Sequence, residues 1–155
     1  MAREIPLNMN DCAIVDDDVY EREAKHNWYK TPEGYAARMS KRPNGQRIVL
    51  YLHWCVMKAQ KGFVVDHING NRLDNRRENL RICTRAQNNI NRKGLNKFKG
   101  VIWREHASAF KAYIKKNKKQ YHLGYFKDEI QAALAYNKAA IELFGEYARL
   151  NQVPQ

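Results

Sequence analysis

An aspartate and a histidine stand side by side after a short apolar run near the middle of the chain. The run covers residues 63–65, and the pair is Asp66 and His67. The carboxylate is a hard oxygen ligand for a metal ion, and the imidazole titrates close to neutral pH. Together they can bind a divalent cation and activate water. The apolar run predicts a strand that delivers the pair at its end.

The residues after the pair predict a loop, a second strand and a helix. Residues 69–75 are dense in turn-forming asparagine and glycine, and residues 80–83 form a second short apolar segment. Thr84 and Gln87 have the spacing of a capping box, which predicts that a helix begins there. Asn88 therefore belongs to the first turn of that helix. The predicted order is strand, loop, strand, helix.

This order and these residues resemble the ββα-metal nucleases, specifically the HNH endonucleases of the phage and intron-homing type. The first motif position corresponds to His67, the second to Asn79 in a Glu-Asn-Leu-Arg segment, and the third to Asn88. The resemblance implies that His67 is the general base and that Asn79 supports the loop around it. It also implies that Asp66 and Asn88 hold Mg²⁺ or Mn²⁺, ions that favour such oxygen ligands.

The first 60 residues predict a small α+β scaffold of a helix and a β-meander. Short strands are expected at residues 5–7 and 13–15, a helix at 17–26, and the meander within 28–52. Phage HNH proteins carry a leucine-histidine pair at a similar distance before the Asp-His strand. His53 is therefore a candidate for the edge of the active site. The alternative is that it is a packed scaffold residue.

From residue 100 the pattern changes to three strands, at about 100–104, 109–115 and 120–125, and one helix, at about 128–144. Residues 93–99 are polar and basic and predict a linker. Alternation predicts that one sheet face is a core, made of Val101, Trp103, Phe110, Ala112, Ile114, Tyr121 and Leu123. The opposite face is basic and aromatic, made of Ile102, Arg104, Lys111, Tyr113, Lys115, Gln120 and His122. The expected apolar stripe of the helix is Ile130, Ala133, Leu134, Asn137, Ala140, Ile141 and Phe144.

The segments 99–101, 121–126 and 145–151 resemble the apetala-two DNA-binding domain of plant ethylene-response factors, a module that phage HNH nucleases also carry. The resemblance implies that the basic face enters the major groove and that Lys99 joins its contacts. This chain has isoleucine, glutamine and histidine at 102, 120 and 122, where the plant domains use arginine and tryptophan at several contact positions. The plant target sequence is therefore not carried over.

Lysine and arginine number 28 against 16 acidic residues, which gives a net charge of +12. Residues 61–95 carry 8 basic and 3 acidic side chains, and residues 96–155 carry 11 and 5, so most of the excess lies in the last two thirds. Double-stranded DNA is the expected partner. An anionic membrane is not expected, because no basic amphipathic helix is evident.

The sequence lacks the residue patterns that several other classes of functional site require. The three cysteines, at 12, 55 and 83, form no C-x-x-C pair, so neither a disulfide framework nor zinc is expected. We expect a cytoplasmic protein of a bacterial or phage-infected cell, since the chain start and its apolar runs predict neither a signal region nor a membrane span. There is no Walker loop, and two serines leave little for a serine triad.

The sequence therefore predicts an α+β protein with a scaffold at 1–60, an HNH ββα-metal motif at 61–92, a linker at 93–99 and an apetala-two-like domain at 100–151. The predicted function is metal-dependent, site-directed DNA cleavage. The alternative is a DNA-binding regulator with an inactive nuclease scaffold, while RNA processing has no visible motif. One motif per chain suits nicking by a monomer, and a weak dimer or two nicks would be needed to cut both strands.

Overall fold

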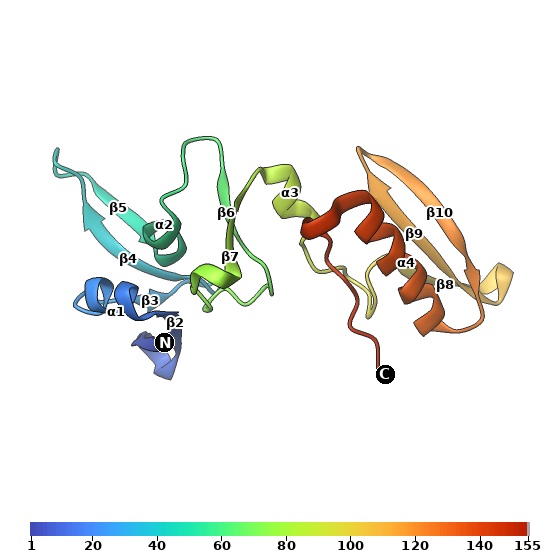
Figure 1. The fold of residues 1–155 in the computed structure, drawn as a ribbon, viewed down its shortest axis with the longest axis horizontal. Helices are drawn as coiled ribbons and strands as arrows, with labels where there is room; N and C mark the ends of the chain where they lie inside the picture. Colours follow the sequence, from blue (N-terminus) through green and yellow to red (C-terminus); the bar gives the residue numbers. More distant parts are fainter. Residues whose placement is uncertain (155) are drawn as a thin grey trace. The chain divides into compact units, whose positions relative to one another are not determined.

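The strands of the chain form four separate antiparallel sheets in a computed structural model that describes residues 1–154 (Figure 1). The chain divides into a first unit, residues 1–88, and a second unit that begins at Asn89. Sheets and helices are mixed in both units. The predicted α+β class is confirmed.

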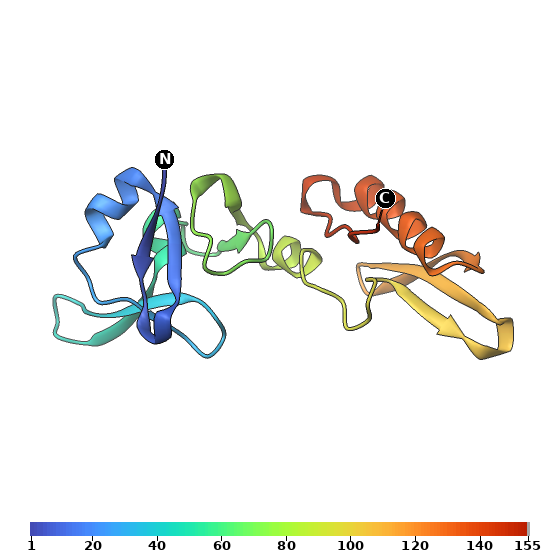
Figure 2. The same ribbon diagram turned by 90° about the horizontal axis from the view of Figure 1, so that it is seen from below.

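The first unit begins with a hairpin, a short helix and a meander. The elements are β1 (Ala2–Pro6), β2 (Cys12–Asp16), α1 (Asp17–Glu23), β3 (Tyr29–Lys30), β4 (Ala36–Lys41), β5 (Arg47–Tyr51) and α2 (Leu52–Met57). Strands β1 and β2 lie side by side, which Figure 2 shows in dark blue. Strands β3, β4 and β5 form the predicted meander. Helix α1 ends at Glu23, three residues earlier than expected.

The central motif folds as predicted, as two strands and a helix. Strand β6 (Val64–His67) pairs with β7 (Leu80–Cys83), and α3 (Arg85–Ile90) follows. The capping box is formed, because Gln87 N–H donates to Thr84 Oγ1 at 3.2 Å and Thr84 N–H donates to Gln87 Oε1 at 2.8 Å. Helix α3 therefore begins at a position that its own sequence determines.

One hydrophobic core joins the scaffold to the nuclease strands. Val15 of β2, Val19 of α1 and Leu52 of α2 are fully buried in it. Val65 of β6 and Leu80 of β7 belong to the same cluster. Residues on both sides of the predicted border at 60 and 61 therefore share one core, so the scaffold directly supports the strands that carry the motif.

The second unit packs a helix on one face of a three-stranded sheet. The elements are β8 (Val101–Arg104), β9 (Ala109–Lys116), β10 (Lys119–Phe126) and α4 (Glu129–Phe144). The sheet order is β10-β9-β8, and Figures 1 and 2 show α4 lying along one of its faces. Asp128 caps α4 by accepting the Ile130 N–H at 3.0 Å. The predicted sheet and helix are both present.

The apolar stripe predicted for α4 was wrong in part. Leu134 and Ile141 are 42% and 54% exposed, whereas Ala132 and Tyr136 are buried. The reason is a close contact across the core: a Cβ on Gly100 would lie 2.2 Å from the Tyr136 ring, so only glycine leaves room for it. Docking of this ring turns α4 away from the face that periodicity alone predicted.

Alternation along the strands correctly predicted which residues share the core face, but these residues are not equally buried. Val101 lies opposite Ala112, and Trp103 lies opposite Phe110, as the predicted face requires. Val101 and Ala112 are buried, whereas Trp103 and Tyr121 are each 42% exposed. Side chains at the margin of this small sheet therefore face partly into solvent.

The end of the predicted linker packs against the second unit. Phe98 is buried in its hydrophobic core, and Lys99 N–H donates to Asn151 Oδ1 at 2.7 Å. The side chain of Asn151 also donates to the Lys99 carbonyl at 3.0 Å. Residues 98 and 99 are thus fixed by tertiary contacts.

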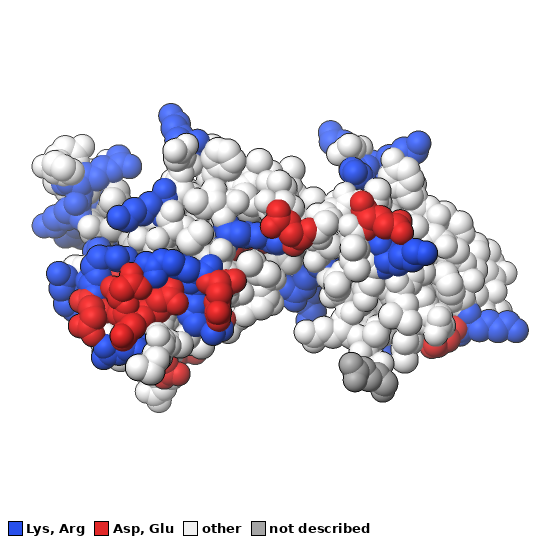
Figure 3. Space-filling model, in the orientation of Figure 1, with Lys and Arg blue, Asp and Glu red and all other residues white. Residues whose placement is uncertain are grey.

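Charge is unevenly spread over the first unit. Figure 3 shows acidic side chains gathered where α1 lies, and Asp17, Asp18 and Glu21 of this helix are exposed. This face is unsuited to a polyanion. Within residues 1–154, no helix is both long enough and apolar enough to cross a membrane.

We predict that Leu52→Ala lowers the free energy of unfolding of the first unit by about 2–5 kcal/mol, because it leaves a cavity in a fully buried core. Urea unfolding followed by tryptophan fluorescence measures this, since Trp28 belongs to the same core. Met39→Ala, at a side chain that is 54% exposed, is the matched control and should change stability by less than about 0.5 kcal/mol. Equal effects of the two variants would contradict the assigned core.

Candidate active site

His67 ends strand β6 and is buried, at 5% exposure. Burial is the main cause that lowers the pKa of its imidazole, while a hydrogen bond to Asn75 and the charges of Asp66 and Asp74 oppose the shift. Its Nε2 lies 3.4 Å from Asn75 Oδ1. With the proton on Nε2, the Nδ1 atom carries the lone pair. His67 is therefore a neutral imidazole that can accept a proton.

Asn79 ties together the two ends of the loop that joins β6 to β7. Its Oδ1 accepts the Asn69 N–H at 3.0 Å, and its Nδ2 donates to the Asp74 carbonyl at 2.8 Å. Its own carbonyl accepts the Ile68 N–H at 2.8 Å. These bonds fix the backbone directly after His67.

The same loop is anchored to the N-terminal hairpin. Asn75 N–H donates to the Ile14 carbonyl at 2.7 Å, and Ile14 N–H donates to the Leu73 carbonyl at 2.8 Å. Asn75 is fully buried, so its side chain is held where it meets His67. Sequence reasoning missed Asn75 as a site residue, and its only signal was its place in the turn-rich loop.

Asp66 forms a buried ion pair across the two motif strands. It lies opposite Arg81 in the register of β6 and β7. Its Oδ2 accepts from Arg81 Nε at 2.9 Å and from a terminal guanidinium nitrogen at 2.7 Å. A buried carboxylate needs such a partner to remain charged, and the paired nitrogens set the orientation of the carboxylate.

Cys83 is the last residue of β7, just before helix α3. Burial raises the pKa of its thiol, and the charge of Asp66 raises it further. The charge of Arg81 and the backbone of Asn88 act in the opposite direction. In the helix, the Asn88 N–H donates to the Thr84 carbonyl at 3.0 Å.

The oxygen donors of Asp66 and Asn88 are of a type that suits one class of metal ion. Across the described chain, no group of three histidine, cysteine or acidic side chains is placed to hold a metal ion. One carboxylate, from Asp66, and one amide oxygen, from Asn88, are a sparse set of hard ligands. Such a set fits an ion of the Mg²⁺ type, which keeps several waters and also binds substrate phosphate oxygens.

His53 stands beside His67 on helix α2. The two rings are 5.1 Å apart at their centroids and meet edge to face. Tyr35 lies 5.2 Å from the His53 ring and 5.9 Å from the His67 ring. Burial, followed by the charge of His67, lowers the pKa of His53 to about 3. Its Nδ1 is buried and has no hydrogen-bond partner in the described part of the chain.

The predicted basic face of the second unit is assembled by strand register. Ile102 lies opposite Lys111, His122 opposite Tyr113, and Gln120 opposite Lys115. Arg104 and Lys115 are exposed. These contacts place the predicted side chains of all three strands on one face of the sheet.

A bulge in β10 adds a residue to this face that sequence reasoning missed. The register shifts between His122 and Gly124, so Tyr125 lies opposite Lys111 rather than on the core face. The Tyr125 ring then lies 4.8 Å from His122. Gly124, with φ of 136°, is the signal in the sequence that could have indicated a break in parity.

Lys99, which was also predicted to contact DNA, precedes strand β8. Its ammonium donates to the carbonyl of Ile90 and, at 2.7 Å, to the carbonyl of Arg92. Burial lowers its pKa to about 8. Carbonyls at the end of a helix lack partners within the helix, and here Lys99 supplies the donor. Its contact with DNA stays a prediction.

Two comparisons with known proteins agree with this arrangement. A family model described as HNH endonuclease matches residues 58–90, which contain β6, β7 and α3. Over 141 residues, the chain is 32% identical to an uncharacterized HNH endonuclease of Acanthamoeba polyphaga mimivirus. That match covers 91% of this chain and 75% of the relative. The similarity therefore extends well beyond the motif itself.

We predict that stability falls as pH drops below neutrality because of His53. Its pKa is about 3 in the folded protein and 6.5 ordinarily, so only the unfolded chain takes up this proton near pH 6. The stabilisation is complete above the ordinary pKa and is lost as pH falls. The free energy of unfolding should therefore fall by about 1 kcal/mol between about pH 7 and pH 5.5.

Urea unfolding of the wild type and of His53→Phe across this pH range measures the effect. Phenylalanine keeps an aromatic ring among Tyr35, Tyr51 and His67 but cannot take up a proton. The stability of the variant should therefore depend less steeply on pH. Parallel curves for the two proteins would show that His53 is not buried in its neutral form.

Proposed function

Because the chain belongs to the HNH endonuclease family, we propose that it is a metal-dependent enzyme that hydrolyses DNA phosphodiesters at sites bound by its C-terminal sheet. The observation that carries the proposal is the buried His67, whose pKa is lowered by burial, next to Asp66, which forms an ion pair with Arg81. A base and a charged oxygen ligand on adjacent residues are what hydrolysis of a phosphodiester requires.

His67 serves as the general base in this proposal. Its lowered pKa leaves the imidazole able to take a proton from the attacking water at neutral pH. Asn75 holds the other ring nitrogen, and Asn79 holds the backbone of the loop. Both asparagines act through position, because a base must be oriented toward the water that it deprotonates.

Asp66 and Asn88 would hold the cation, and Mg²⁺ or Mn²⁺ suits these oxygen donors. The bound cation supplies positive charge that stabilises the oxyanion and the leaving oxygen. Arg81 forms an ion pair with the Asp66 carboxylate and fixes its direction. His53, against the His67 ring, is proposed to close the edge of the site.

The second unit is proposed to be an apetala-two-like module that binds DNA in the major groove. Its support is the basic and aromatic face opposite α4, formed by Ile102, Arg104, Lys111, Tyr113, Lys115, Gln120, His122 and Tyr125. We further propose the division at 1–60, 61–92, 93–99 and 100–151. The protein would act as a phage or homing nuclease that nicks as a monomer or cuts both strands as a weak dimer.

We predict that His67→Ala lowers the rate of DNA cleavage at least about 100-fold, because it removes the proton acceptor. Supercoiled plasmid and phage or host DNA are incubated with Mg²⁺, Mn²⁺ or EDTA, and nicked and linear products are measured. DNA binding should be nearly unchanged. His26→Ala, three residues after the end of α1 and outside the motif, is the control.

Three outcomes of the cleavage experiment separate the alternatives. Metal-dependent cleavage that is lost only in His67→Ala supports the proposed base. Wild-type cleavage by His67→Ala would exclude this role for His67. Tight, salt-sensitive binding without cleavage under any cation would identify a DNA-binding regulator built on a nuclease scaffold.

We predict that Arg104→Ala and Lys115→Ala weaken DNA binding and lower the slope of log affinity against log salt by about one each, because each phosphate contact releases about one counterion. Binding in EDTA over a salt series measures this. Lys138→Ala removes the same charge from the exposed side of α4 and should leave the slope unchanged. Unchanged salt slopes for all three variants would mean that this sheet face stays exposed to solvent and does not contact DNA phosphates.

A further inference from the structure

Arg72 lies in the loop after His67 and is held in place by the N-terminal meander. Its guanidinium carbon is 4.7 Å from the centroid of the Tyr35 ring, and it donates a hydrogen bond to the Glu33 carbonyl. Its Cδ would lie 4.0 Å from a Cβ on Gly34, so the side chain runs directly over this turn. Stacking and a backbone acceptor together give an exposed arginine a defined orientation.

The Tyr35 ring connects this guanidinium to the candidate active site. The ring lies 4.7 Å from the Arg72 guanidinium carbon, 5.9 Å from the His67 ring and 5.2 Å from the His53 ring. The positive charge of Arg72 is among the causes that lower the pKa of His67, which places it within electrostatic reach of the base. Arg72 therefore stands at the rim of the site.

Arg72 acts on the Glu33 carboxylate through its charge without forming an ion pair, unlike the neighbouring arginines. Arg76 pairs with Asp74 at 2.8 Å, Arg77 with Asp18 at 2.6 Å, and Arg81 with Asp66 at 2.7 Å. Within residues 1–154, Arg72 forms no ion pair, and its only hydrogen bond goes to the Glu33 carbonyl. The remaining N–H groups of an oriented guanidinium are thus open to an anion.

We propose that Arg72, stacked on Tyr35, binds a non-bridging oxygen of the DNA phosphate that is presented to His67. This inference rests on the proposed function and adds a substrate-binding residue to it. A planar guanidinium suits this role, because two parallel N–H groups can bind one phosphate and fix its direction. Bound in this way, Arg72 holds the phosphate against the base and offsets charge that grows during hydrolysis. It also gives the N-terminal meander a part in substrate binding.

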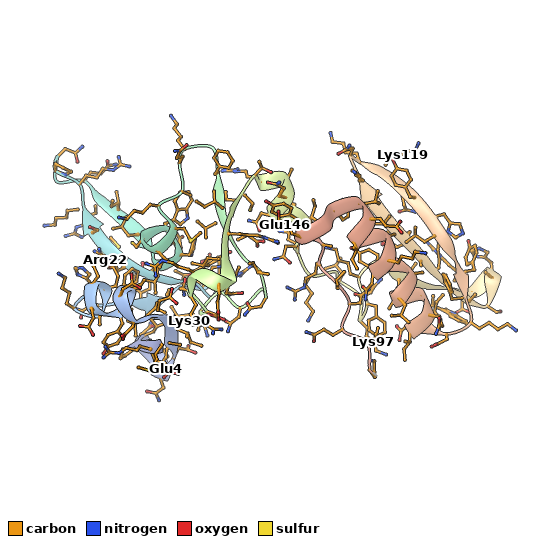
Figure 4. All side chains as sticks on the ribbon, in the orientation of Figure 1. Glu4, Arg22, Lys30, Lys97, Lys119 and Glu146 are labelled. Atoms are coloured by element: carbon orange, nitrogen blue, oxygen red, sulfur yellow. The ribbon has the colours of Figure 1, made fainter. Side chains whose placement is uncertain are left out.

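The test compares Arg72→Ala with Arg22→Ala in the full-length protein. Arg22, labelled in Figure 4, lies on α1, whose face is acidic, so its loss removes the same charge away from the site. Arg72→Ala should slow cleavage of saturating DNA in Mg²⁺ by about 100-fold, the effect of losing one donor to a developing oxyanion. Arg72→Lys should recover only part of the rate, because an ammonium lacks the planar pair of donors.

Substitutions of Tyr35 test whether stacking on its ring orients Arg72. Tyr35→Phe keeps an aromatic face and should cleave like the wild type, whereas Tyr35→Leu removes the face and should slow cleavage, though less than Arg72→Ala. Circular dichroism verifies that each variant is folded. Equal cleavage rates for Tyr35→Leu and Tyr35→Phe would show that the aromatic ring does not contribute to phosphate binding by Arg72.

A binding measurement separates this inference from the proposed nuclease function. In EDTA, where no cleavage is expected, Arg72→Ala should lower the salt slope of DNA binding by about one, and Arg22→Ala should not change it. If the wild type cleaves DNA and Arg72→Ala equals it in rate and slope, the phosphate contact is refuted while the nuclease stands. If the wild type never cleaves, the nuclease fails, and the slope alone decides whether Arg72 meets a phosphate.

Discussion

The structure of the site depends on one constraint, which is that the buried polar groups of the loop between β6 and β7 must find hydrogen-bond partners. Asn79 bonds to both ends of this loop, and Asn75 is held by Ile14 of the N-terminal hairpin. Because these groups satisfy one another inside the fold, the loop has one stable path. The position of His67 follows from that path, so the fold itself orients its imidazole.

Burial has opposite consequences for the two residues at the end of β6. Consecutive strand residues point to opposite faces, so Asp66 and His67 meet different surroundings. Around His67 the neighbours are aromatic rings and an amide, and burial keeps the imidazole neutral. Asp66 instead meets the guanidinium of Arg81, which compensates the charge that burial would otherwise penalise. The two residues at this strand end therefore have different electrostatic surroundings.

In both units, part of a sheet packs into the core, and another part presents polar and aromatic side chains. In the second unit, α4 covers one face, while register and a bulge collect basic and aromatic residues on the other. In the first unit, the meander shares a core with the motif strands and also brings Tyr35 against the two histidines. The scaffold at 1–60 therefore does more than support the fold, because its aromatic residues form part of the surroundings of the site.

The sequence by itself determined the features that depend on near neighbours. The strands at 64–67 and 80–83, the cap formed by Thr84 and Gln87, and the two-faced sheet follow from alternation and from contacts three residues apart. Only the tertiary structure decided which distant segments meet. The bond between Asn75 and Ile14, the stack of Arg72 on Tyr35, the bulge that turns Tyr125 outward and the contact of Tyr136 with Gly100 all join residues whose approach no local pattern encodes. They depend on how whole elements pack, which periodicity within one element does not specify.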